Sequence, residues 1–154
     1  MALLPLLVLP VLGGCGEGPP NCPYAGDGDD APSAGCFAVR DGGLLLVQGM
    51  NGKVSLPGGL SLPGESAQCT AHRETWEETG LALEPRRLMH VFSTGFHLYR
   101  CDGAGVSGEI DPPPRWEVRD AFFLAPSSFE NYEWRFNDQM ELLRFMMTAP
   151  GAGL

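Results

Sequence analysis

The sequence is short of positive charge. It contains 10 lysine and arginine residues against 19 aspartate and glutamate residues, and its formal net charge at pH 7 is -9. Proteins that bind the phosphate backbone of nucleic acids normally carry a basic surface, so this balance argues against a nucleic-acid partner. A small phosphorylated ligand remains compatible with it, because a bound metal ion and a few local basic residues can meet the charge of one small molecule.

The sequence also lacks an apolar run of about 20 residues, the length that a membrane-spanning helix needs. The apolar run at residues 2–12 is shorter and suits the core of a signal peptide, although no lysine or arginine precedes it. It leads into Leu12-Gly13-Gly14-Cys15, which resembles a bacterial lipoprotein signal. We therefore expect an exported, periplasmic protein that is anchored to the membrane through lipidated Cys15. The alternative is a cytoplasmic protein with an apolar tail.

Glycine, proline and aspartate dominate residues 16–33, which leaves little to bury and predicts a linker. The expected organisation is therefore a signal segment at 1–15, a linker at 16–33 and one globular domain at 34–149. A chain of 154 residues has room for one domain with a real core.

The cysteines bear on the compartment. If Cys15 carries lipid, an even number remains, which is compatible with two disulfides in an oxidising compartment: Cys22, Cys36, Cys69 and Cys101. The sequence does not decide how they pair. The alternative is small buried thiols in a reducing cytoplasm.

Short apolar runs bounded by glycine and proline predict strands, and two longer segments predict helices. The expected strands cover 36–40, 44–48, 53–56, 87–94, 96–101 and 116–124, and the expected helices cover 67–79 and 137–148. Asp41-Gly42-Gly43 between the first two strands is typical of a hairpin. These elements predict an α+β domain in which a mixed sheet lies between helices.

The stretch from 59 to 81 carries the chemistry. Gly58, Gly59 and Gly64 favour a loop that bends sharply, Ser66 is a good N-cap, and Gly80 is a good helix stop. Within this helix three glutamates fall at i, i+3 and i+4 and share one face: Glu74, Glu77 and Glu78. Carboxylates crowded in this way favour a hard divalent cation such as Mg²⁺ or Mn²⁺, and Mg²⁺ commonly binds together with substrate phosphates.

The same stretch resembles the Nudix box, G-x5-E-x7-R-E-U-x-E-E-x-G-U with U aliphatic. The fixed places are filled by Gly59, Glu65, Arg73, Glu74, Glu77, Glu78, Gly80 and Leu81. Only Thr75 departs, at an aliphatic position, and its shape is close to that of valine. So many specified positions at fixed spacing make a chance match far less plausible than a lone glycine-rich motif would. The alternative is a solvated acidic helix without a function.

The resemblance implies roles for these residues. Glu74, Glu77 and Glu78 match the metal-binding glutamates, and the Gly59 carbonyl is a further expected ligand. Glu74 also occupies the position that acts as the base in some members of the family, whereas in other members the base lies outside the box. Arg73 is expected to orient a neighbouring glutamate, and the alternative is a weak surface ion pair with Glu77.

Further residues are expected to support the box or to bind substrate. Gly58, Glu65 and Gly80 support the loop and the helix. Outside the box, Phe96, Tyr99 and Glu117 are candidate substrate-binding residues, although an exposed strand position is the preferred interpretation of Glu117. Trp134 and Arg135 either line the mouth of a pocket or cap the core, and the second interpretation is preferred.

The sequence thus predicts a Mg²⁺-dependent Nudix hydrolase that cleaves the diphosphate linkage of a nucleoside diphosphate, or of a related diphosphate compound linked to another group. One alternative is a non-catalytic sensor of a nucleotide or metabolite. Another is a prenyl-diphosphate isomerase on the same fold, which would need a catalytic cysteine in the pocket; neither Cys69 nor Cys101 is placed in an obvious way to supply it.

Overall fold

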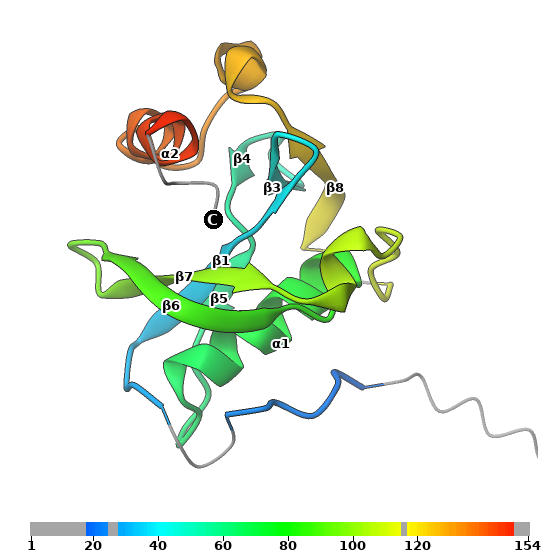
Figure 1. The fold of residues 1–154 in the computed structure, drawn as a ribbon, viewed down its shortest axis with the longest axis vertical. Helices are drawn as coiled ribbons and strands as arrows, with labels where there is room; N and C mark the ends of the chain where they lie inside the picture. Colours follow the sequence, from blue (N-terminus) through cyan, green and yellow to red (C-terminus); the bar gives the residue numbers. More distant parts are fainter. Residues whose placement is uncertain (1–17, 25–27, 115–116, 150–154) are drawn as a thin grey trace, which may run out of the picture.

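The computed structural model describes residues 18–24, 28–114 and 117–149 (Figure 1). The elements run in the order β1 (Ser33–Phe37), β2 (Val39–Arg40), β3 (Gly43–Gly49), β4 (Val54–Ser55), β5 (Gly58–Leu60), α1 (Ala67–Thr79), β6 (Glu84–Val91), β7 (Phe96–Asp102), η1 (Ala104–Ser107), β8 (Val118–Leu124), η2 (Pro126–Asn131) and α2 (Gln139–Thr148). The predicted signal segment with Cys15 lies outside the described residues, as does Trp116 in the last predicted strand.

The described strands form two sheets of four strands each. The first has the order β5-β1-β7-β6, in which β1 and β7 are parallel and the other neighbours are antiparallel. In the second, β3 pairs antiparallel with β2, β4 and β8. The mixed sheet of an α+β domain is therefore confirmed, but the strands are divided between two sheets. The predicted strand at 36–40 is interrupted at Ala38, so its first part pairs in one sheet and its last part in the other.

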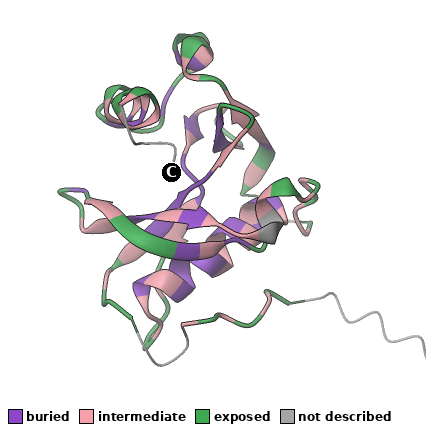
Figure 2. Ribbon diagram, in the orientation of Figure 1, coloured by how far each residue is buried: buried purple, intermediate pink, exposed green. Residues whose placement is uncertain are grey.

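Helices cover the strands from opposite sides. Helix α1 packs on β1 and β5, whereas α2 and η2 lie on the other side of the first sheet, beside β3 and β4 (Figure 1). One apolar cluster joins α1 to the first sheet, and the other contains residues of both sheets and of α2. The ribbon in Figure 2 is purple where residues are buried. No helix in the described part of the chain is long and apolar enough to cross a membrane.

Capping residues at both ends set the bounds of helix α1 where the sequence predicts them. The Ser66 Oγ accepts a hydrogen bond from the Cys69 N–H at 3.3 Å, which satisfies one of the free donors of the first turn. Gly80 takes the left-handed conformation at φ 77° and its N–H donates to the Trp76 carbonyl at 2.8 Å. The helix therefore begins and ends where its capping residues require, and the positions of its glutamates are set.

Two disulfides join the N-terminal half of the chain to the core. Cys22 pairs with Cys69 and so ties the predicted linker to α1, and Cys36 pairs with Cys101 across the parallel strands β1 and β7. Asp29 adds a further attachment, because its carbonyl accepts a hydrogen bond from the Ala67 N–H at 2.7 Å. The described part of the linker is thus held along the start of α1.

We predict that replacing both Cys36 and Cys101 by alanine lowers the free energy of unfolding of the oxidised protein by about 2–5 kcal/mol. Both residues are fully buried, and the disulfide closes a loop with a sequence separation of 65 residues. Urea unfolding in the absence of reductant measures the difference. In excess dithiothreitol the difference from the wild type should shrink, and equal stabilities in oxidising buffer would contradict the assigned pairing.

Candidate active site

Helix α1 places two of its glutamates against the glycine pair of β5. A Cβ built on Gly59 would lie 2.5 Å from the Glu74 Cδ, so the Glu74 carboxylate lies directly against the Gly59 backbone. One turn later, the Glu78 Oε2 accepts a hydrogen bond from the Gly58 N–H at 2.8 Å. The spacing of the motif thus brings these two carboxylates onto the strand that precedes the helix.

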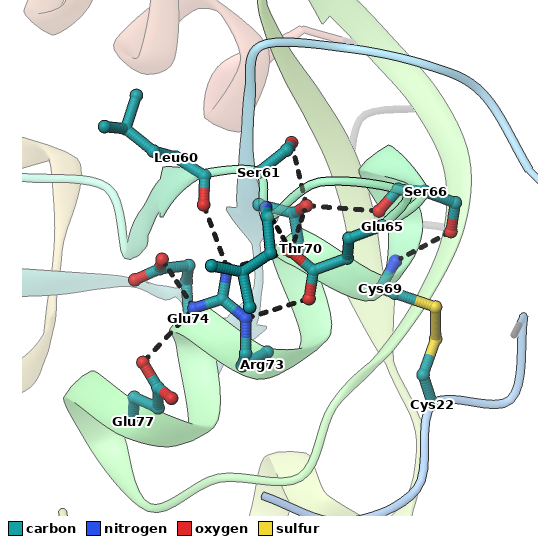
Figure 3. Close-up of polar contacts among 11 residues, drawn as sticks. Cys22, Leu60, Ser61, Glu65, Ser66, Cys69, Thr70, Arg73, Glu74 and Glu77 are labelled. Atoms are coloured by element: carbon teal, nitrogen blue, oxygen red, sulfur yellow. Dashed lines mark hydrogen bonds and ion pairs between the residues drawn. A yellow bond between two sulfur atoms is a disulfide. The ribbon is translucent and has the colours of Figure 1, made fainter.

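Arg73 is the centre of a polar network on this face of α1 (Figure 3). Its Nε and Nη2 donate to the two carboxylate oxygens of Glu65 at 2.8 and 2.9 Å. Its Nη1 donates to Glu74 at 2.7 Å and to Glu77 at 3.3 Å, and its Nη2 also reaches the Leu60 carbonyl at 2.9 Å. The side chain is only 14% exposed. Arg73 therefore contacts Glu74 directly as well as Glu77, and its role in orienting Glu74 stays a prediction.

Glu65 holds the loop to the helix. Besides Arg73, its carboxylate accepts hydrogen bonds from the Leu62 N–H at 3.0 Å and the Thr70 hydroxyl at 2.9 Å. Burial by itself would raise the pKa of Glu65, but the hydrogen bonds from Arg73 and Leu62 outweigh burial and lower it. The lowered pKa favours the charged carboxylate of Glu65, which joins the loop to the helix through these contacts.

Glu74 and Glu78 have the opposite electrostatic character. Burial raises the pKa of Glu78 to about 8, against the hydrogen bond from Gly58, and the charges of Glu74 and Glu117 add to the rise. Burial also raises the pKa of Glu74, although Arg73 opposes the shift. Carboxylates that are disfavoured as anions in this way are stabilised as anions when a cation binds beside them.

These two carboxylates open onto a cleft of about 660 Å³ between α1, β3 and β5. Glu117, directly before β8, lines the same cleft, as does Arg135 from the segment before α2. Glu117 is exposed, as preferred from the sequence, but its position is also beside the helix glutamates. The cleft therefore combines three carboxylates with two cationic side chains, those of Lys53 and Arg135.

The carboxylates of the cleft do not converge on a single position. In residues 18–24, 28–114 and 117–149, no three histidine, cysteine, aspartate or glutamate side chains are grouped closely enough to hold a metal ion. Glu77 turns toward Arg73, whereas Glu74 and Glu78 share the cleft. The residues present nevertheless fit a hard cation, because Glu74 and Glu78 offer carboxylate oxygens. Burial raises the pKa of both side chains, and a cation bound beside them would stabilise their charged forms. Glu74, Glu78, Glu117 and the Gly59 backbone line the cleft and are available to hold it. Glu77 accepts a hydrogen bond from Arg73 at 3.3 Å and stays a predicted ligand.

The two predicted substrate-binding residues of β7, Phe96 and Tyr99, lie on opposite faces of the sheet. Phe96 lines a second pocket that adjoins the cleft, on the side of the sheet that faces α2. Tyr99 lies on the other face, is 1% exposed, and donates its hydroxyl proton to Asp29 at 2.9 Å. Burial and this hydrogen bond raise the pKa of Tyr99. The structure therefore does not bring Tyr99 to the cleft, because alternate residues of a strand point to opposite faces.

The neighbouring residues Trp134 and Arg135 also have different environments. Trp134 is buried, packs edge-on against Phe129, and donates its indole N–H to the Phe129 carbonyl at 3.0 Å, so it caps the core as preferred. Arg135 instead lines both the cleft and the adjoining pocket. Phe136 and Gln139 line the pocket with it and were not predicted from the sequence. Phe136 stands just before the predicted helix at 137–148 and Gln139 lies within its first turn, and neither position carries chemistry by itself.

We predict that Gly59→Ala lowers catalytic activity about 10²-fold, because the new methyl group displaces the Glu74 carboxylate by roughly an ångström. The end of a flexible side chain gives way, so the free energy of unfolding should change by less than about 1 kcal/mol. Initial rates and urea unfolding measure the two effects. Gly18→Ala is the matched control, since no atom lies within 4 Å of that position. Unchanged activity in Gly59→Ala would show that Glu74 is not held in its working position by this backbone.

Comparison with known proteins agrees with this arrangement. The NUDIX domain family model matches residues 29–144. A mouse protein called nucleoside diphosphate-linked moiety X motif 6 is 38% identical over 79 residues, which cover 49% of this chain and 25% of the mouse protein. A MutT-like protein from Streptomyces ambofaciens is 33% identical over 78 residues, 47% of this chain and 51% of that protein. These matches span about a quarter and about half of the two relatives.

A solved structure gives the same result for the fold. The crystal structure of an ADP-ribose pyrophosphatase from Streptococcus suis superposes with a TM-score of 0.58 at 22% identity, and the match covers 76% of this chain and 91% of that chain. The α+β fold expected from the motif is therefore confirmed. With the family model spanning most of the chain and the motif residues assembled on α1, this protein belongs to the NUDIX domain family.

Proposed function

We propose that the protein is a hydrolase dependent on Mg²⁺ or Mn²⁺ that cleaves the diphosphate linkage of a nucleoside diphosphate or related compound joined to another group. The observation that carries this proposal is the shared cleft of Glu74, Glu78 and Glu117 beside the Gly58–Gly59 backbone. Burial raises the pKa of the two helix carboxylates, so a bound cation would stabilise them as anions. The same cation would reduce the repulsion between these carboxylates and an approaching diphosphate.

A divalent cation bound there would neutralise phosphate oxygens and lower the pKa of the attacking water. The residues of the chain hold and orient the reactants. Glu74 and Glu78 supply carboxylate oxygens, and Arg73 holds Glu74 in one orientation at 2.7 Å. Glu74 or Glu117, which both line the cleft, accepts a proton from water as its oxygen attacks phosphorus. The bridging P–O bond then breaks, and the leaving phosphate carries away its electron pair.

The names of the relatives support the same substrate class. The mouse relative is named for a nucleoside diphosphate linked to another moiety, and the Streptococcus suis protein is named an ADP-ribose pyrophosphatase. Both names describe a diphosphate with a nucleoside on one side. The isomerase alternative is disfavoured here, because Cys69 and Cys101 are both in disulfides and offer no free thiol.

A substrate panel tests the proposal. ADP-ribose, a UDP-linked sugar, a nucleoside triphosphate and a prenyl diphosphate are incubated with the full chain and Mg²⁺, and the products are separated by anion-exchange chromatography. We expect cleavage of a nucleoside-diphosphate-linked compound into two phosphorylated products. Tight binding of these compounds without any cleavage would favour the sensor, and conversion of the prenyl diphosphate without loss of phosphate would favour the isomerase.

We also propose that the protein works in an oxidising compartment after export. The two disulfides and the lipoprotein-like sequence before Cys15 support this proposal. Fractionation of expressing cells and the mass of the N-terminal peptide test it. A soluble cytoplasmic protein with an unmodified N-terminus and free thiols would contradict it.

A further inference from the structure

The two disulfides differ in their access to solvent. Cys36 and Cys101 are 0% and 1% exposed and join the parallel strands β1 and β7. Cys22 is half-buried and stands in residues 18–24, which form neither helix nor strand, and its partner Cys69 is 8% exposed. Thiol–disulfide exchange requires that an attacking thiolate reaches one of the sulfur atoms. The sulfur of Cys22 is therefore the one most open to attack.

The position of Cys69 in α1 favours the same bond as the one that breaks. Attack on the Cys22 Sγ releases Cys69 as a thiolate, which keeps the electron pair of the S–S bond. Cys69 is the third residue of α1, and the free N–H groups and dipole at the start of a helix stabilise the negative charge of a thiolate. Cys36 and Cys101 lie in strands, whose net dipoles are small. The Cys22–Cys69 bond is therefore the more easily reduced of the two.

The disulfide is what holds residues 18–24 to α1. The Tyr24 N–H donates to the Cys22 Sγ at 3.4 Å, but no hydrogen bond joins residues 18–24 to the rest of the described chain. The later Asp29 has its own attachments, since its N–H donates to the Gln68 Oε1 at 2.9 Å and its carbonyl accepts from α1. Reduction therefore frees residues 18–24 and leaves Asp29 in place.

Cys69 adjoins the polar network of the active site (Figure 3). The next residue, Thr70, donates its hydroxyl proton to the Glu65 carboxylate at 2.9 Å. Glu65 in turn accepts two hydrogen bonds from Arg73, which also holds Glu74 at 2.7 Å. The disulfide thus restrains the turn of α1 from which this network begins. Reduction removes the restraint, so the carboxylates of the network are held less firmly.

We propose that the Cys22–Cys69 bond is a site of thiol–disulfide exchange, which a dithiol protein of the thioredoxin class reduces, and that its reduction lowers kcat. One thiolate of the dithiol attacks Cys22, and Cys69 leaves as a thiolate and takes up a proton. The second thiol of the dithiol then displaces Cys22 from the mixed disulfide. Two electrons pass to the two cysteines, and the dithiol is oxidised to a disulfide. The exchange is independent of the proposed function, whereas the effect on kcat rests on it.

Graded reduction tests the exchange site without any substrate. The folded full chain is equilibrated with increasing dithiothreitol, thiols are blocked with iodoacetamide, and peptide masses identify the modified cysteines. Cys22 and Cys69 should be half modified at a concentration at least about tenfold lower than Cys36 and Cys101. Reduced thioredoxin in place of dithiothreitol should open the same pair. Modification of both pairs together, or protection of all four residues until the protein unfolds, would overturn the proposal.

Activity before and after this reduction tests the link to the cleft. When only the Cys22–Cys69 bond is open, kcat for the preferred diphosphate substrate should fall about tenfold. KM should stay within about twofold, because residues 18–24, all of them described, line neither the cleft nor the adjoining pocket. Reoxidation should restore the rate. Cys22→Ser should have the lower kcat in both buffers, whereas Asn21→Ser, at the exposed neighbouring residue, should respond as the wild type does.

Equal kcat in the oxidised and reduced wild type would contradict the link between this bond and the active site. A further loss of activity when Cys22→Ser is reduced would contradict it as well. If the oxidised protein cleaves no diphosphate at all, the proposed function fails, and the pattern of modified cysteines still decides whether the exchange site exists.

Discussion

Glu78→Gln should lower the rate of diphosphate cleavage by at least about 10²-fold, because changes to groups that only support a metal ligand already cost 10–100-fold. The substitution keeps the shape of the side chain and its acceptor for the Gly58 N–H, so the hydrogen bond at 2.8 Å can be retained. What it removes is the negative charge that faces the cleft. Initial rates at saturating Mg²⁺ measure the loss.

The same variant should fold at least as well as the wild type. Because burial raises the folded-state pKa of Glu78 to about 8, its ordinary pKa being near 4.5, the metal-free wild type loses stability as the pH rises through this range. Glutamine does not ionise, so the unfolding midpoint of metal-free Glu78→Gln at pH 9 should equal or exceed that of the wild type. Glu141→Gln is the control, since this exposed glutamate of α2 lies outside the cleft. Full activity in Glu78→Gln would contradict the role of Glu78.

Arg73→Ala should lower both stability and activity. The substitution leaves three carboxylates, those of Glu65, Glu74 and Glu77, without the guanidinium that they share, in side chains that are 11–17% exposed. Breaking a largely buried ion pair on one side costs about 3–5 kcal/mol, so we expect a loss of this size in the free energy of unfolding. Activity should fall at least about 10²-fold, because Glu74 loses its orientation.

Two further variants distinguish orientation from charge alone. Arg73→Lys keeps the charge but cannot donate two parallel hydrogen bonds to Glu65 while it also reaches Glu74, so it should recover stability in part and activity little. Arg86→Ala removes an arginine that is 50% exposed and pairs with Glu84 and Asp102, and it should leave the free energy of unfolding nearly unchanged. A loss in Arg73→Ala no greater than in Arg86→Ala would show that the network in Figure 3 stabilises nothing.

The sequence predicted those features that are decided by neighbouring residues. The bounds of α1 follow from Ser66 and Gly80, which satisfy free backbone groups at the two ends of the helix. The hairpin between β2 and β3 follows from Asp41 and Gly42, both of which take positive φ, as a tight two-residue turn requires. In such cases neighbouring residues exclude the competing conformations, so a short stretch of sequence is sufficient to predict the element.

Other features depend on contacts between distant parts of the chain. The interruption at Ala38 has no local signal, because the division into two sheets follows from the pairing of β1 with β7 and of β3 with β8. The same holds for the disulfide pairing and for Glu117 and Arg135, which reach the cleft only because separate segments pack beside β3 and β5. Composition and spacing do not encode such placements.

The most direct test of the account is the dependence of cleavage on a divalent cation. Product release from the preferred diphosphate substrate is followed while Mg²⁺ is titrated into metal-free protein, and EDTA is then added to the most active sample. The account predicts no turnover without the cation, a saturable rise with Mg²⁺, and complete loss with EDTA. Cleavage that proceeds at the same rate in EDTA would contradict the role given to the carboxylates of α1.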